Sequence, residues 1–144
     1  MTRQLTRQLE GVQTEVVIQR FVDRVLVLVT QLGKVGNLIQ ATIPETTPLA
    51  PPATADELPE PSPAIQLTPL LGQGPSQHMQ TLHSLYAAQI ATIIWTASSN
   101  PLDVTRKSVV VGIALQRTSS DDENLTAHER NVFGGVMKMI LELV

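Results

Sequence analysis

Hydrophobic positions in this chain either alternate with polar ones or run together over short stretches typical of β-strands. The run Val25–Val29 is aliphatic at every position, so we expect a strand inside the sheet with both of its faces covered. Val22-Asp23, a poor turn pair, and Gly33–Gly36 are the short links that predict an antiparallel meander of the first three strands. The expected strands are residues 12–21, 25–29, 37–43, 65–71 and 106–117.

Helical spacing appears twice, once in the middle of the chain and once at its end. Apolar residues three or four positions apart predict a long helix that begins after Ser76 and ends at Ser98. The stripe consists of Met79, Leu82, Tyr86, Ile90, Ile93 and Ala97. A second stripe predicts a C-terminal helix, with Thr126-x-x-Glu129 and Ser120-x-x-Glu123 as competing capping boxes. Its members are Leu125, Val132, Val136 and Ile140, with Phe133, Met137, Leu141 and Val144 beside them.

The elements combine into one small α+β domain. Their order is three strands, a loop, a strand, a helix, a strand and a helix, which predicts a mostly antiparallel sheet with two flanking helices. We expect residues 1–10 to be a flexible arm, or one helical turn through Leu5 and Leu9, and residues 11–144 to be the domain. Residues 44–64 carry seven prolines and predict a disordered or extended surface loop, because proline removes backbone donors.

Composition changes the picture mainly through its low charge. The chain has 144 residues, of which 42% are hydrophobic and only 16% charged, with a net charge of −3. This balance fits a protein with part of its surface covered by a partner, or a monomer whose surface is rich in Gln, Thr and Ser. No Lys or Arg lies between Lys34 and Arg106, which argues against nucleic-acid binding. The longest apolar run falls short of 18 residues, so no membrane span is expected.

Residues that could carry chemistry are few. Gly33-Lys34 fails as a phosphate loop because Leu28 and Val35 occupy the positions that need Gly and Ser or Thr. His78 and His83 are five residues apart, whereas zinc-binding helices use a spacing of four. The chain has no cysteine, and we find no catalytic, cofactor-binding or metal-binding set. Trp95 fits either the core or an interface anchor.

Four residues are candidates for partner contact. On the last expected strand one face is aliphatic, while the other carries Gly112 and Ala114, whose small size would let another layer approach closely. Lys34 and Val35 lie in an expected exposed turn, and Lys34 is the only lysine of the first hundred residues.

The segment V-L-V-L-V-T-Q-L-G-K-V-G-N-L-I, residues 25–39, resembles the signature of the proteasome assembly chaperone 3 family. Weaker matches follow in the same order at residues 13–17, Leu70–Gln73 and 109–115. The resemblance covers about residues 12–43 and 65–144. The proline-rich loop and an acidic insertion at residues 119–124 depart from the family pattern.

The resemblance implies a non-enzymatic chaperone of the cytoplasm, with a nuclear location left open. Its members pair with a structural relative, proteasome assembly chaperone 4, and help alpha-type subunits form the seven-membered ring of the 20S proteasome. A homodimer in isolation also stays open. The alternative is an interaction scaffold of similar architecture, such as a longin- or profilin-like adaptor, which the turn at Thr30–Gly36 disfavours.

Overall fold

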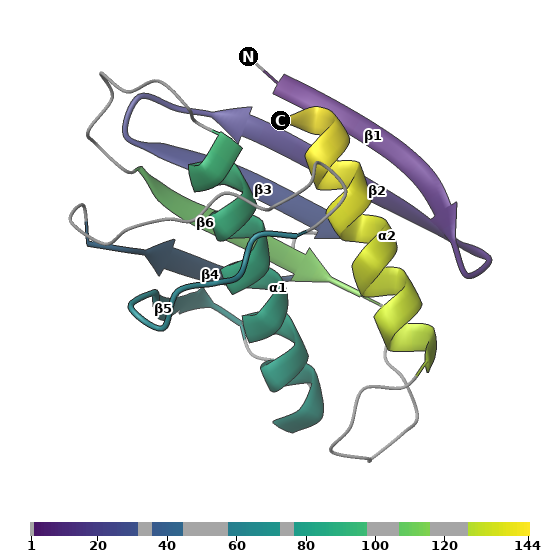
Figure 1. Cartoon of the computed structure of the whole chain (residues 1–144). Helices are drawn as coiled ribbons and strands as arrows, with labels where there is room; N and C mark the ends of the chain where they lie inside the picture. The colour runs from purple at the N-terminus through teal and green to yellow at the C-terminus, as the bar shows by residue number, and fades with distance from the viewer. Residues whose placement is uncertain (1, 32–35, 45–57, 73–76, 98–106, 116–126) are drawn as a thin grey trace.

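The computed structural model of the chain describes residues 2–31, 36–44, 58–72, 77–97, 107–115 and 127–144. Six strands form one sheet and two helices pack on it (Figure 1). This arrangement confirms the α+β prediction. The elements are β1 (Thr2–Leu9), β2 (Val12–Arg20), β3 (Arg24–Thr30), β4 (Asn37–Thr42), β5 (Gln66–Leu71), α1 (Gln77–Ala97), β6 (Ser108–Ala114) and α2 (Ala127–Leu143).

The sheet has the order β1-β2-β3-β6-β4-β5. Four of its five pairings are antiparallel, and β3 pairs with β6 in parallel. The prediction of a three-strand meander is therefore wrong at its second link, because β6 lies between β3 and β4. Strand β3 is inside the sheet, as its unbroken aliphatic run predicted.

The N-terminal segment corrects a second expectation. Residues 2–9, which we expected as an arm or a helical turn, form β1 along the full length of β2. Three contacts bind β1 to α2: Arg3 donates to the carbonyl of Leu143 at 2.7 Å, Arg7 pairs with Glu142 at 2.7 Å, and Leu9 packs against Gly135. Backbone pairing and these contacts hold a strand whose side chains bury little area.

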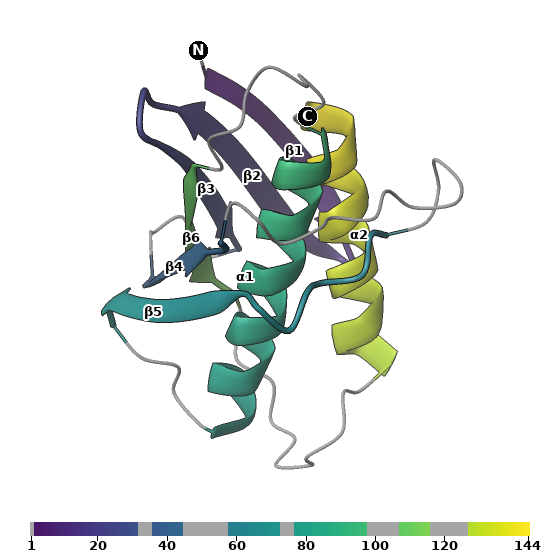
Figure 2. The same ribbon diagram turned by 60° about the vertical axis from the view of Figure 1, so that its left-hand side comes forward.

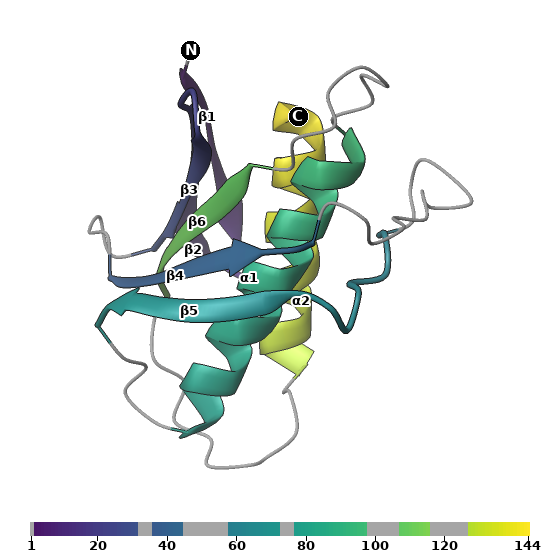
Figure 3. The same ribbon diagram turned by 90° about the vertical axis from the view of Figure 1, so that its left-hand side faces the viewer.

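Both helices cover the same face of the sheet, and the sheet twists strongly beneath them (Figures 2 and 3). α1 packs on β4 and β6, and α2 packs on β1 and β2. The alternate residues of the strands that point at the helices are buried with the helix stripes in one core. Trp95 belongs to that core, where its indole N–H donates to the carbonyl of Lys107 at 2.8 Å.

The end of the proline-rich segment lies against α1. Pro59 is buried, and its carbonyl accepts a hydrogen bond from the side chain of Gln89 at 2.8 Å. Residues 58–64 contain no helix or strand, as proline predicts, but they are not a free surface loop. Residues 45–57, and the two capping boxes expected before α2 except for Glu129, lie outside the described residues.

Candidate functional site: the open face of the sheet

The described helices leave the opposite face of the sheet uncovered (Figure 3). Strand alternation decides which residues reach it. On β3, Val25, Val27 and Val29 are buried under the helices, while Leu26 and Leu28 point the other way and are half-buried. We call this surface the open face.

The strand register places the apolar residues of the open face in one row. Val17 pairs with Leu28, Leu28 with Gly112, Gly112 with Leu38, and Leu38 with Leu71. This apolar row crosses five strands, from β2 to β5. At its centre Gly112 contributes no side chain between the two leucines, so the backbone of β6 is the floor of the row there.

Polar, mostly uncharged residues border the apolar row. One flanking row contains Gln19 and Gln40, with Leu26 and Val110 between them. The charged residues that strand alternation assigns to β2, β3, β4 and β6 on this face are Glu15, which bonds Gln4, and Arg24 at the start of β3. An apolar centre with few charges and a polar border is the anatomy of a protein–protein interface.

The segment Thr30–Gly36, which carries the family resemblance and which we call the family-like turn, begins and ends at one end of this face. Gln31 N–H, just after β3, donates to the carbonyl of Ala114 at 2.8 Å. Gly36, just before β4, lies so close to β6 that a Cβ there would be 2.8 Å from the Cβ of Ala114. The two described ends of the turn therefore bracket the end of β6, the strand inserted between β3 and β4.

Of the four candidate contact residues, Gly112 and Ala114 lie on the open face by strand register, but both are buried, and Ala114 is 5% exposed. Lys34 and Val35 lie outside the described residues. Their role in partner contact stays a prediction. Sequence reasoning missed the rest of the row, which consists of Val17, Leu28, Leu38 and Leu71. The signal was available in the run at residues 25–29, because a strand that is apolar on both faces needs both faces covered, and the two described helices cover only one.

A buried polar pair lies near the start of β4. The Asn37 amide nitrogen is 3.2 Å from Nδ1 of His83, and both residues are buried. Burial lowers the pKa of His83, so its neutral form is favoured at neutral pH. Asn37 Oδ1 and His83 Nε2 have no hydrogen-bond partner in the described structure. This pair joins α1 to the sheet.

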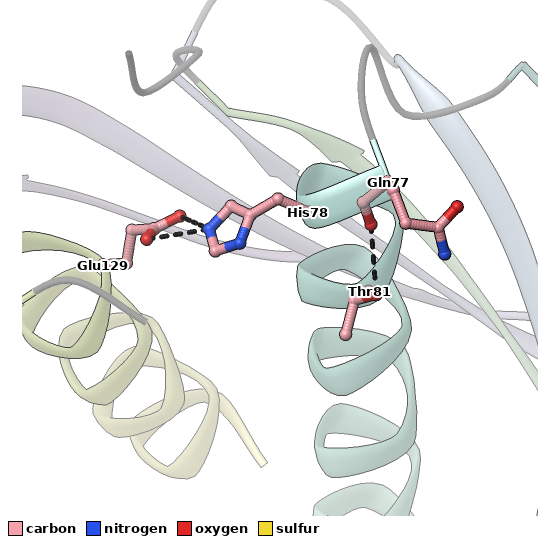
Figure 4. Close-up of polar contacts among 4 residues, drawn as sticks. All are labelled: Gln77, His78, Thr81 and Glu129. Carbon is pink, nitrogen blue, oxygen red and sulfur yellow. Dashed lines mark hydrogen bonds and ion pairs between the residues drawn. The ribbon is translucent and has the colours of Figure 1, made fainter. Parts of the chain in front are cut away.

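A second pair joins the first turns of the two helices (Figure 4). Nε2 of His78 lies 2.9 and 2.7 Å from the two carboxylate oxygens of Glu129, whose side chain is almost fully buried. Burial and the charge of Glu129 raise the pKa of Tyr86, which keeps that hydroxyl protonated. His78, whose spacing from His83 argued against a zinc site, is thus part of an interhelix contact.

The chemistry of these groups is structural. Among the described residues, no three His, Asp or Glu side chains converge as a metal site would require. None of the helices in the described part of the chain is long and apolar enough to cross a membrane.

Comparisons with known proteins agree with this architecture. The sequence model of the proteasome assembly chaperone 3 family matches residues 27–140. A crystal structure of a chaperone complex for yeast 20S proteasome assembly contains a chain of similar fold, with a TM-score of 0.57 and 14% identity. The match covers 97% of this chain and 98% of that one. No curated protein sequence matches the chain.

Proposed function

Because the chain belongs to the proteasome assembly chaperone 3 family, we propose that it is a non-enzymatic chaperone for the alpha-subunit ring of the 20S proteasome. It acts as a heterodimer with a structurally related chaperone, proteasome assembly chaperone 4, in the cytoplasm and nucleus. Family membership and the open face support this proposal together. The match of the whole chain to a chain of a yeast chaperone complex supports a role within a complex.

The apolar row is the observation that supports binding of a partner chaperone. Leu28 and Leu38 are held in place by strands whose opposite faces are packed under helices, so the row is rigid before binding. Rigid apolar surface reduces the entropy lost on association. A second sheet laid on this face would reach the backbone at Gly112, and the uncharged Gln and Thr border would avoid the cost of burying charges.

Size-exclusion chromatography with light scattering of the co-expressed pair tests the dimer. Leu28→Asp places a charge in the row, next to Gly112, and is expected to yield folded monomer, because a buried unpaired carboxylate is costly. Leu85→Asp, on the exposed surface of α1, is the matched control and should keep the dimer. A wild-type chain that stays monomeric beside the sister chaperone contradicts the proposal, and a homodimer that excludes the sister contradicts the heterodimer.

Client binding is a separate measurement. The purified heterodimer is expected to bind at least one isolated alpha-type subunit of the 20S core particle. A longin- or profilin-like adaptor would bind none of them, so a heterodimer without any such affinity would favour the alternative.

A further inference from the structure

The turn between β2 and β3 exposes two large apolar side chains. Phe21 is 47% exposed and Val22 is 94% exposed, at the end of the sheet seen on the left of Figure 1. The N–H of Phe21 donates to the carbonyl of Arg24 at 2.8 Å, which closes a two-residue loop of Val22 and Asp23. We call residues 20–24 the β2–β3 tip.

The need for a tight turn does not explain why Val22 and Asp23 occupy this loop. Two-residue hairpin loops favour Asn and Gly because the preferred turns need positive φ. Neither Val22 nor Asp23 has a positive φ, and valine is a poor turn residue. At 94% exposure Val22 contributes almost nothing to the core. The tip is therefore better suited to contact with another molecule than to folding.

The tip is also held firmly. Nζ of Lys107 donates to the carbonyl of Phe21 at 3.3 Å, and the carbonyl of Lys107 accepts the indole N–H of Trp95 from α1. Arg24 and Asp23 form an ion pair at 3.1 Å beside it. These contacts anchor the backbone of the tip, which reduces the conformational entropy lost when Phe21 and Val22 bind.

Positive charge surrounds the apolar tip. By strand alternation Arg20 belongs to the helix-covered face and Arg24 to the open face, and Lys107 lies just before the neighbouring strand β6. Within the described part of this cluster the carboxylate is Asp23, and Arg24 pairs with it. Three basic side chains, Arg20, Arg24 and Lys107, therefore stand against one described carboxylate in a chain whose net charge is −3. A complementary surface would be apolar at its centre and acidic at its border.

We propose that the β2–β3 tip inserts Phe21 and Val22 into an apolar pocket bordered by carboxylates on the client subunit. The inference rests on the proposed function, in which the sister chaperone covers the open face and the client must be held elsewhere. The tip lies at the end of the strands, so the two contacts are compatible. Arg20 and Lys107 steer the approach, and the two apolar side chains supply the contact itself.

Val22→Asn separates binding from folding. Asparagine is a favoured turn residue, so the variant should match or exceed the wild-type unfolding temperature. Its heterodimer should bind the client at least about tenfold more weakly, as expected for an interface hot spot. Affinity is measured by biolayer interferometry against each of the purified alpha-type subunits. Leu85→Asn, an equally conservative change at an exposed leucine of α1, should leave affinity unchanged.

The role of the basic side chains is tested by measuring the rate at which the heterodimer associates with the client. Arg20→Gln should slow association and flatten its salt dependence, since steering acts mainly on that rate. Arg130→Gln, at an exposed position of α2, is the control and should change neither. Full client affinity in Val22→Asn overturns this inference while the proposed function stands. A wild-type heterodimer that binds none of the subunits overturns both.

Discussion

Replacing Gly36 by alanine tests whether the family-like turn is required for the fold. Gly36 has φ +68°, a conformation that L-residues with a Cβ rarely adopt. It also lies directly against β6, where a Cβ would overlap the carbonyl oxygen of Ile113 and stand 2.8 Å from the Cβ of Ala114. The obstacle is largely backbone in the central part of the sheet, which cannot move aside as a flexible side chain would.

Two costs therefore add in Gly36→Ala. The left-handed backbone costs an alanine about 1–2 kcal/mol. Forcing a methyl group into packed surroundings costs about 1–3 kcal/mol. We expect a total loss of about 2–5 kcal/mol of unfolding free energy, which for a domain of this size lowers the midpoint temperature by about 4–20 °C. Against a typical stability of about 5–15 kcal/mol, this is a large fraction.

Urea denaturation followed by circular dichroism measures the loss, and two other glycines separate its parts. Gly11 has φ +77° with nothing within 4 Å of a Cβ, so Gly11→Ala reports the backbone cost alone. Gly134 is inside α2 with equally open space, and Gly134→Ala should stabilise by about 1 kcal/mol through helix propensity. If Gly36→Ala costs no more than Gly11→Ala, the close approach to β6 is not the reason for the glycine.

Three further changes test the buried polar groups. Burial lowers the pKa of His83 below its ordinary 6.5, so the unfolded chain binds more protons than the folded one. The stability of the protein should therefore fall as the pH drops below about 6.5. Denaturation at several pH values should show a shallower fall in the variant His83→Gln. Gln89→Ala should cost about 1–3 kcal/mol in urea denaturation, since the carbonyl of buried Pro59 loses its donor, and an unchanged midpoint would contradict that role. His78→Ala should cost about 3 kcal/mol in urea denaturation, because the buried carboxylate of Glu129 loses its contact with the imidazole. A second change, Glu129→Gln, should restore part of the loss, and additive losses in the double variant would count against the pair.

Local pattern predicted the helices well because their periodicity is strong. The residues Met79, Leu82, Tyr86, Ile90 and Ile93 are all buried on α1, as the spacing of three and four indicated, whereas Ala97 at its end is exposed. Strands β2 to β6 also lie near their predicted positions. These predictions share one property: each depends on contacts within one segment or with one continuous core.

The order of the strands in the sheet could not be predicted from local sequence in the same way. β6 begins at Ser108, far along the chain from the ends of β3 at Thr30 and β4 at Thr42, yet it enters the sheet between them. Nothing in the sequence of β3 or β4 indicates that β6 is the neighbouring strand. β1 was missed for the opposite reason: Thr, Gln and Arg dominate it, and only Leu5 and Leu9 offer an apolar period. Its stability comes from the ladder with β2 and from the Arg3 and Arg7 contacts with α2, which local sequence does not reveal.

The insertion of β6 also explains why the most recognisable segment of the chain holds no chemistry. β3 and β4 stand one strand apart, so the two described ends of their connection, Gln31 and Gly36, both lie against the end of β6 at Ala114, and the missing Cβ of Gly36 permits that approach. The same insertion carries Gly112 to the centre of the apolar row, between Leu28 and Leu38. The turn is thus a structural requirement of the open face. A substitution at Gly36 should therefore weaken partner binding through the sheet, even if no residue of the turn touches the partner.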